Sequence, residues 1–253
     1  MLGASLLIIT SQAARGQDDA AKVQFLLTWA QRGDAIAQDS VGAAYALGIG
    51  VAEDDKEAVR WFRLAAMQGN ADAEDHLGNM YEDGKGVAQD YSEALKWYRL
   101  AAAQGLAVAE CNLGNLYEDG HGVARDYAEA VKWYQLAAAQ GYAEAQNDLG
   151  NMYHAGTGVA QDYSGALKWY RLAAMQDVAA AQFNLGMIYF HGFGVLQDYV
   201  RAHMWFNIAA ANGAPSAAKA RDLIANNMTV EQIAQAQDMA HRCETSHYKQ
   251  CDQ

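Results

Sequence analysis

Two cysteines and two histidines lie close together near the end of the chain, and these residue types could bind a metal or form a disulfide. They are His241, Cys243, His247 and Cys251. Two imidazoles and two thiolates could hold zinc in a tetrahedral set. The tail lacks the Cys-x-x-Cys pair of many zinc sites, and a near cysteine pair in an exported chain is typical of a disulfide. We expect a Cys243–Cys251 disulfide and no metal, with zinc as the alternative.

The remaining candidates for chemistry do not form a recognisable catalytic motif. A reactive Cys111 thiol would need a cationic setting, and its neighbour Glu110 opposes one. The recurring Gly-x-Gly segments follow expected helices rather than strands, and no Lys-Ser/Thr pair comes next, so they indicate turns rather than phosphate loops. No serine, histidine and acid stand in a nucleophile pattern. The sequence therefore predicts a non-enzyme without catalytic residues or cofactors.

Polar residues recur on one side of the expected first helix of each repeat, opposite the apolar stripe. A side-chain amide both donates and accepts, so a ladder of asparagines could bond the backbone of an extended peptide. The alternatives are an ordinary solvated face or asparagines that bridge neighbouring repeats. The candidate binding residues are Asp72, His76, Asn79, Asn112, Asn115, Asp148, Asn151, Asn184 and Met187.

The C-terminal end of this ladder becomes apolar. Phe183, Phe190 and Phe193 join Met187 there, whereas the earlier part of the ladder is acidic. A groove that is acidic at one end and apolar at the other favours a basic or amphipathic peptide.

The elements that carry these residues repeat every 36 positions. Five tryptophans show the step most clearly: Trp61, Trp97, Trp133, Trp169 and Trp205. A period of this length is typical of a solenoid, in which each unit completes its core with its neighbours. We expect five helix-turn-helix repeats at 33–68, 69–104, 105–140, 141–176 and 177–212. The predicted fold is all-α.

The first helix of each repeat carries a glycine in its middle. In the second repeat, Ala73, Leu77 and Met80 share one helical face, and Gly78 lies within the same helix. Glycine costs about 1 kcal/mol there relative to alanine. Its recurrence indicates a backbone contact too close for a Cβ atom.

The turn and the second helix have their own signals. Gly84 and Gly86 permit positive φ, and Val87 is expected to enter the core from the loop. Asp90 with Glu93 predicts a capping box, which Asp54 with Glu57 and Asp126 with Glu129 repeat. At two later caps the acid is replaced, by Gly165 after Asp162 and by Arg201 after Asp198, so those helix starts should be weaker. A glycine such as Gly105 ends each second helix, but Asp177 replaces it once and should strain that turn.

Both ends differ from the repeats. Residues 1–16 contain the apolar run Leu2 to Ile9, which is too short to span a bilayer and resembles a secretory signal without a basic start. Residues 17–32 should form a capping helix. Residues 213–253 should form capping helices and a cysteine-containing tail, with Thr229 and Gln232 as a capping box. We therefore expect a periplasmic or secreted protein without membrane insertion of the mature chain; the alternative is a cytoplasmic one.

The charge of the chain limits its partners. Its 253 residues carry a net charge of −12 and a pI near 4.9. Nucleic-acid binding needs clustered Lys and Arg, so nucleic acid is excluded as an expected partner. A protein or peptide partner fits better.

The repeat motif resembles a known family. Residues 71–102 read Ala-x-Ala-Glu-x-x-Leu-Gly-x-x-Tyr-x-x-Gly-x-Gly-Val-x-x-Asp-Tyr-x-x-Ala-x-x-Trp-Tyr-x-x-Ala-Ala, and 107–138 are nearly the same. This pattern is similar to that of the Sel-one-like repeat family; the first copy departs from it at Val41 and Asp55. The resemblance implies a right-handed α/α superhelical solenoid related to tetratricopeptide arrays and used mostly for protein–protein contacts. The tail resembles that of exported bacterial members.

The resemblance also frames the expected function. It implies a non-catalytic scaffold that holds a partner in a concave groove, in the bacterial cell envelope. One alternative is a periplasmic regulator of a sensor kinase or of a polysaccharide export system. Another is a β-lactamase-like hydrolase, but the cysteine-rich members assigned that activity carry a cysteine pair in each repeat, which this chain lacks.

Overall fold

The computed structural model describes residues 18–248 and Cys251, and this part of the chain contains helices and no strand. The signal-like residues 1–16 lie outside the described residues. The first described helix covers 18–30. The others are α2 (Ala35–Leu47), α3 (Asp55–Ala66), α4 (Ala71–Asp83), α5 (Tyr91–Ala103), α6 (Ala107–Asp119), α7 (Tyr127–Ala139), α8 (Ala143–Ala155), α9 (Tyr163–Ala174), α10 (Ala179–His191), α11 (Tyr199–Ala211), α12 (Ala217–Ala225) and α13 (Val230–Thr245).

The helices pair as the 36-residue period predicts. The first helices of the five repeats are α2, α4, α6, α8 and α10, and the second helices are α3, α5, α7, α9 and α11. The predicted all-α solenoid of helix-turn-helix repeats is confirmed. The chain divides into two compact units. The first ends at Arg125 and the second begins at Asp126.

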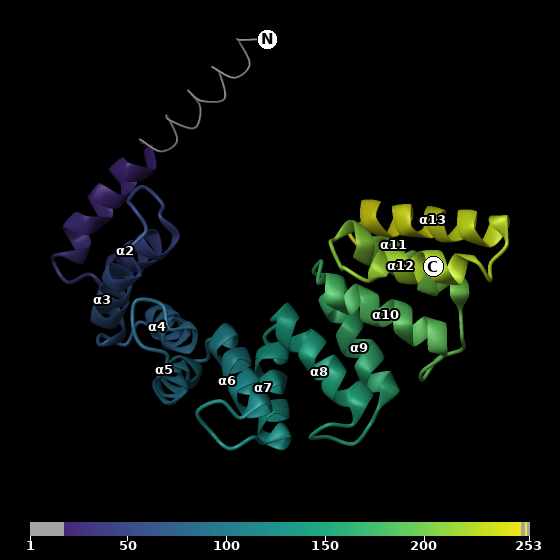
Figure 1. Cartoon of the computed structure of the whole chain (residues 1–253), viewed down its shortest axis with the longest axis horizontal. Coiled ribbons are helices and arrows are strands. Elements are labelled where there is room, and N and C mark those ends of the chain that lie inside the picture. Colours follow the sequence, from purple (N-terminus) through teal and green to yellow (C-terminus); the bar gives the residue numbers. More distant parts are fainter. Residues whose placement is uncertain (1–17, 249–250, 252–253) are drawn as a thin grey trace, which may run out of the picture. The chain divides into compact units, whose positions relative to one another are not determined.

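In the first unit each helix packs on the next, from α2 to α6 (Figure 1). One core cluster contains Phe62, Leu77 and Met80, which are all buried, and Val87 packs against it from the loop as predicted. The apolar residues of each helix are thus buried against the neighbouring helices. Repeats of this size bury their cores in this way.

In the second unit the same packing runs from α7 to α11, after which α12 and α13 both pack on α11 (Figure 1). The core here extends from Tyr170 and Leu185 through Trp205 and Phe206 to Met239 of α13. Thr229 and Gln232 form the predicted capping box at the start of α13. The last two helices therefore cover the apolar side that a sixth repeat would otherwise cover.

The glycine within each first helix faces an aromatic ring rather than a backbone. A Cβ on Gly78 would lie 2.5 Å from Cε1 of Tyr98 in the second helix of the same repeat, and Gly186 meets the ring of Phe206 in the same way. The expected backbone contact was wrong at this position. Sequence periodicity indicates only that the space is filled, and here a planar ring packed flat on the helix fills it.

The close backbone contact occurs instead at the second glycine of the turn. A Cβ on Gly122 would lie 2.5 Å from the carbonyl oxygen of Tyr91, at the start of the preceding second helix. Gly50 lies equally close to Asp19 in helix 18–30. Helix 18–30 therefore occupies the place of a second helix before the first repeat.

The aspartate caps form as predicted, but the capping boxes do not. The Asp90 carboxylate accepts hydrogen bonds from the backbone N–H groups of Ser92 and Glu93, at 2.9 and 3.1 Å. Within the described residues, the acids at the third helical position pair with a basic residue three positions further on, as Glu129 does with Lys132. Asp162 and Asp198 each accept a single backbone bond, which agrees with the weaker starts expected there.

The fourth junction has the strained backbone that the sequence predicts. Asp177 has a φ of 63°, where Gly105 and Gly141 have 81° and 91°. A residue with a Cβ atom adopts this left-handed region at a cost of about 1–2 kcal/mol.

Candidate partner-binding surface

Several candidate binding residues bond to the neighbouring repeat in the first unit. Nδ1 of His76 lies 2.8 Å from Oδ1 of Asp39, and the Asn112 amide donates to Oδ1 of Asp75 at 2.9 Å. In the second unit the Asn184 amide donates to Oδ1 of Asn147 at 3.2 Å. Each pair is 37 positions apart in the sequence. For these residues the structure shows asparagines and a histidine that bridge neighbouring repeats, which was one of the alternatives.

The asparagine one turn further along each helix supports the second helix of its own repeat. The Tyr98 hydroxyl lies 2.7 Å from the Asn79 side-chain oxygen, and the Tyr170 hydroxyl lies 2.8 Å from that of Asn151. The Asn79 amide also donates to Asp75 at 3.0 Å. Asn151 remains exposed, whereas Asn79 is half-buried. The later asparagine is therefore the more accessible to a ligand.

The buried carboxylate of Asp75 dominates the electrostatics of the first unit's ladder. Burial raises the pKa of Asp75, while hydrogen bonds from Asn112 and the charge of His76 act against that rise. Burial alone would lower the pKa of His76, but the hydrogen bond and charge of Asp39, together with the charges of Asp75 and Asp72, raise that pKa. Asp39, Asp75, His76 and Asn112 thus supply hydrogen bonds and opposite charges to one another.

The other candidates lie on the same helices with different degrees of exposure. Asp72 is exposed, whereas Asn115 and Asp148 are half-buried. The charge of Asp148 adds to a rise in the pKa of Tyr170 that burial mainly causes.

A pocket in the second unit brings three of the candidates together. It has a volume of about 520 Å³ and lies between α8 and α10, with Tyr170 of α9 in its wall. Asn151, Asn184 and Met187 line it, and Phe183, His191 and Phe193 provide much of the remaining wall. The apolar end of the ladder is therefore a concave site rather than a flat surface.

His154 and Tyr170 line this pocket although the sequence analysis did not single them out. His154 lies one helical turn from Asn151, and its ring centroid is 5.3 Å from that of Phe193. Burial, together with the nearby His191, lowers the pKa of His154. Its imidazole is therefore neutral near pH 7, and the pocket offers an uncharged aromatic wall beside two amides. Such a site can hold an apolar side chain while the amides bond a peptide backbone.

The exposed leucines of the second helices form a rival surface. Leu64 and Leu100 are exposed in the first unit, and Leu136 and Leu172 in the second, each at the same repeat position.

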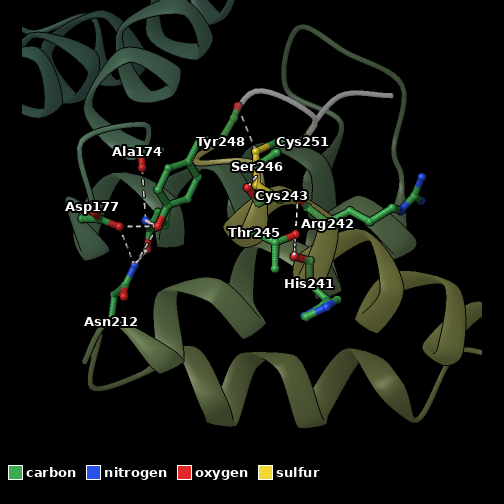
Figure 2. The surroundings of a disulfide bond; sticks show 11 residues. Ala174, Asp177, Asn212, His241, Arg242, Cys243, Thr245, Ser246, Tyr248 and Cys251 are labelled. Atoms are coloured by element: carbon green, nitrogen blue, oxygen red, sulfur yellow. Dashed lines mark hydrogen bonds between the residues drawn. A yellow bond between two sulfur atoms is a disulfide. The ribbon is translucent and has the colours of Figure 1, made fainter.

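The two tail cysteines form a disulfide, Cys243–Cys251. Figure 2 shows the Tyr248 side chain extending from this loop toward Asp177 and Asn212. Its hydroxyl bonds to the Asp177 carboxylate and lies 3.2 Å from the side-chain nitrogens of Gln182 and Asn212. The disulfide loop is thereby fixed to the last junction between repeats.

The described residues contain no cluster of three or more histidine, cysteine or acidic side chains that could hold a metal ion. With both sulfurs in the disulfide, the four tail residues do not present a thiolate set for zinc. Cys111 is 3% exposed, as a small core residue. Among the described residues, no helix has the length and apolar character needed to cross a bilayer.

Stacked helix pairs that bury their apolar faces against neighbouring helices define an α-helical repeat protein. Matches to the Sel1 repeat cover residues 35–70, 71–106, 107–142, 143–178 and 179–213. The chain belongs to the Sel1 repeat family. Proteins of this family are generally non-catalytic protein-interaction scaffolds.

Solved structures of bacterial proteins share the fold. A Sel1 repeat protein from Oxalobacter formigenes is 31% identical over 97% of both chains, with a TM-score of 0.78. The protein c5321, a protective antigen present in uropathogenic Escherichia coli strains, is 31% identical, with a TM-score of 0.58. That match covers 91% of this chain and 58% of the antigen. A Sel1 repeat protein from Klebsiella pneumoniae, at 23% identity and a TM-score of 0.54, shares the fold. No curated protein matches this chain.

Proposed function

We propose that this protein is a non-catalytic scaffold that binds a partner protein or peptide on the face formed by the first helices of its repeats. The pocket between α8 and α10 carries the proposal, because it combines Asn151, Asn184 and Met187 in one concave site. Its apolar wall suits an anchoring side chain, and its amides suit the adjoining backbone.

The charge of the chain favours a basic or amphipathic partner. The net charge is −12. Complementary charge raises both the rate and the specificity of association, so an acidic chain favours a basic partner. Nucleic acid does not fit the same surface.

An oxidising compartment is the proposed location. The Cys243–Cys251 disulfide supports the periplasm or the cell exterior over the cytoplasm, because cytosolic thiols are kept reduced. Within the envelope, a regulator of a sensor kinase or of a polysaccharide export system would use the same kind of surface; co-purification with such a membrane complex would distinguish it from a general scaffold.

The test is capture of partners from a bacterial envelope extract by crosslinking and mass spectrometry, with two matched variants. Met187→Glu places a charge in the pocket, and Leu136→Glu places one on an exposed second helix of the same unit. We expect Met187→Glu to reduce capture of the specific partner by about tenfold, the equivalent of roughly 1.4 kcal/mol, while Leu136→Glu leaves it unchanged.

The reverse pattern would move the site to the leucines of the second helices. Equal capture by both variants and the unaltered chain would contradict a role for either surface. Far-ultraviolet circular dichroism of each variant shows whether a loss of capture follows from unfolding.

A further inference from the structure

The first helix of the first repeat carries apolar side chains where the second repeat carries polar ones. Ile36, Ala43 and Leu47 of α2 occupy the repeat positions of Asp72, Asn79 and Asp83 in α4. Ile36 and Leu47 are 72% and 68% exposed. The Ile36 position is also apolar in two later repeats, at Val108 and Ala180, whereas Leu47 is the largest aliphatic side chain at its own position. Exposed apolar groups that gather beside a cavity are typical of a binding surface.

Ala43 and Leu47 line a cavity in the first unit. It has a volume of about 370 Å³ and lies between helix 18–30 and α2. Val23 and Leu26 line one side, and Ala43, Leu47 and Ile49 line the other. No aromatic ring of the described residues lines it, in contrast to the pocket between α8 and α10. The shape and lining therefore suit a branched aliphatic side chain.

The walls of this cavity are fixed by the repeat packing. Gly50 lies so close to the backbone of Asp19 that a Cβ atom would clash with it. Ala30, at the other end of helix 18–30, is buried with Val41 of α2 and with Trp61. The cavity is thus held between two anchored helices, and an occupant would enter a preformed site.

The surroundings of the cavity are acidic. Residues 18–125 contain 18 of the chain's 30 acidic residues and 9 of its 18 Lys and Arg residues. Asp19 and Asp39 line the cavity; Lys22, which also lines it, is paired with Asp18 at 2.6 Å and with Asp19 at 3.4 Å. Asp72 lies close enough to raise the pKa of His76, whose ring bonds Asp39. Carboxylates therefore outnumber basic groups around the opening.

We propose that this cavity is a second docking site, which takes an aliphatic side chain from a basic segment of a partner protein. The proposal rests on the proposed scaffold function and adds a separate site to it. Adjacent helix axes lie about 10 Å apart and an extended chain advances about 3.3 Å per residue, so a basic residue about three positions from the anchor meets Asp39 and Asp72. The anchor fills the cavity and the cation selects the partner.

The test uses a synthetic peptide of about twelve residues, roughly 40 Å when extended, with a serine and threonine background. It carries one photo-leucine and a lysine three positions away on each side. The full chain is irradiated with this peptide, and crosslinked residues are mapped by mass spectrometry. We expect crosslinks within helix 18–30 and 36–49, and a reduction of about fivefold or more for Leu47→Glu or for a peptide with glutamate in place of lysine.

Leu100→Glu is the matched control, because Leu100 is 49% exposed on a second helix of the same unit. This substitution should leave crosslinking unchanged. Crosslinks that persist in Leu47→Glu, or that are indifferent to the lysines, would overturn the proposal. Crosslinks confined to the pocket between α8 and α10 would refute this site and leave the scaffold function standing. No crosslink at either site, together with partner capture unaffected by Met187→Glu, would count against both.

Discussion

The side-chain amide of Asn112 donates a hydrogen bond to the carboxylate of Asp75, which lies 37 positions earlier in the chain and only 2.9 Å away. His76 meets Asp39 and Asn184 meets Asn147 with the same offset. These bonds join the first helix of one repeat to the first helix of the next. A buried polar group must find such a partner, so the bonds favour one register of neighbouring repeats over others.

Replacement of Asp75 by asparagine should make the stability of the protein less dependent on pH. Asn147 occupies the equivalent position in the fourth repeat and accepts the equivalent bond. Burial raises the pKa of Asp75, so the stability associated with its protonated form is present at low pH and is lost as the pH rises through that pKa. Asparagine does not titrate.

The difference in melting temperature, Asp75→Asn minus the unaltered chain, should therefore become more positive between about pH 4 and about pH 7. Thermal melts followed by circular dichroism across that range measure it. A difference that is constant, or that falls with pH, would show that the hydrogen bonds to the carboxylate and the charge of His76 together outweigh its burial. Because both proteins retain Glu74, whose pKa burial also raises, its contribution cancels in the difference.

Gly78→Ala should destabilise the protein even though alanine is the better helix former. The new Cβ would lie 2.5 Å from Cε1 of Tyr98, whose side chain is fully buried. Overpacking of this kind costs typically about 1–3 kcal/mol, against a gain in helix propensity of about 1 kcal/mol. Urea unfolding should show a lower midpoint with an unchanged slope.

A double variant tests the reason for that loss. Tyr98→Leu removes the ring that opposes Gly78, so the added cost of Gly78→Ala should be smaller in the Tyr98→Leu background than in the unaltered chain. Equal costs in the two backgrounds would place the effect in the helix itself rather than in the contact with Tyr98.

Most of the fold follows from local signals in the sequence. The helical period, the turn glycines and the aspartate caps each depend on a few adjacent residues, which is why the helices and the strained Asp177 could be predicted. The capping boxes predicted for the aspartate caps were wrong because the acid can bind another partner. Glu93 forms an ion pair with Lys96, three positions further on. A sequence motif alone does not decide whether such a glutamate bonds to the cap backbone or to a nearby lysine.

The candidate site was harder to predict because its contacts depend on the packing of neighbouring repeats. The asparagine positions were found, but their bonds to residues 37 positions earlier were not. His154 was missed since it lies beside the ladder rather than on it, and it reaches the pocket by packing near Phe193. The exposed apolar residues of α2 could have been found from the sequence, because Ile36 and Leu47 align with Asp72 and Asp83 of the next repeat.

Loss of the tail disulfide should destabilise the C-terminal cap and free Tyr248 from the last junction. The bridge closes a loop with a sequence separation of 8, and closure of so short a loop stabilises by about 2–3 kcal/mol. Cys251→Ser should therefore lower the unfolding free energy by about that amount. Tyr248→Phe, which keeps the disulfide but removes the hydroxyl bonded to Asp177, should cost less, about 1 kcal/mol.

Urea unfolding of the three proteins without reductant, and of the unaltered chain with dithiothreitol, compares these effects. Reduction should bring the unaltered chain to the stability of Cys251→Ser. Retention of full stability after complete reduction, checked by thiol titration, would show that the packing of α13 on α11 holds the cap without the disulfide.

Binding of an apolar anchor in the pocket between α8 and α10 should weaken in acid. Burial and His191 lower the pKa of His154, so its neutral form prevails at pH 7.5. An apolar side chain that covers the ring would disfavour the imidazolium further, and affinity should fall as the pH drops below the ordinary histidine pKa of about 6.5. The titratable neighbours of His154 are His191 and Tyr163, whose ring centroid lies 5.4 Å from its own.

The probe is a labelled peptide with one tryptophan between lysines, followed by fluorescence anisotropy at about pH 7.5 and about pH 5.0, on either side of the ordinary histidine pKa. We expect the dissociation constant to rise roughly fivefold in acid for the unaltered chain and less for His154→Gln, whose side chain does not titrate. Met187→Glu reports whether the peptide occupies this pocket at all. A pH dependence that persists in His154→Gln would assign the effect to another group, whereas peptide binding that is insensitive to both pH and Met187→Glu would place the anchor elsewhere on the protein.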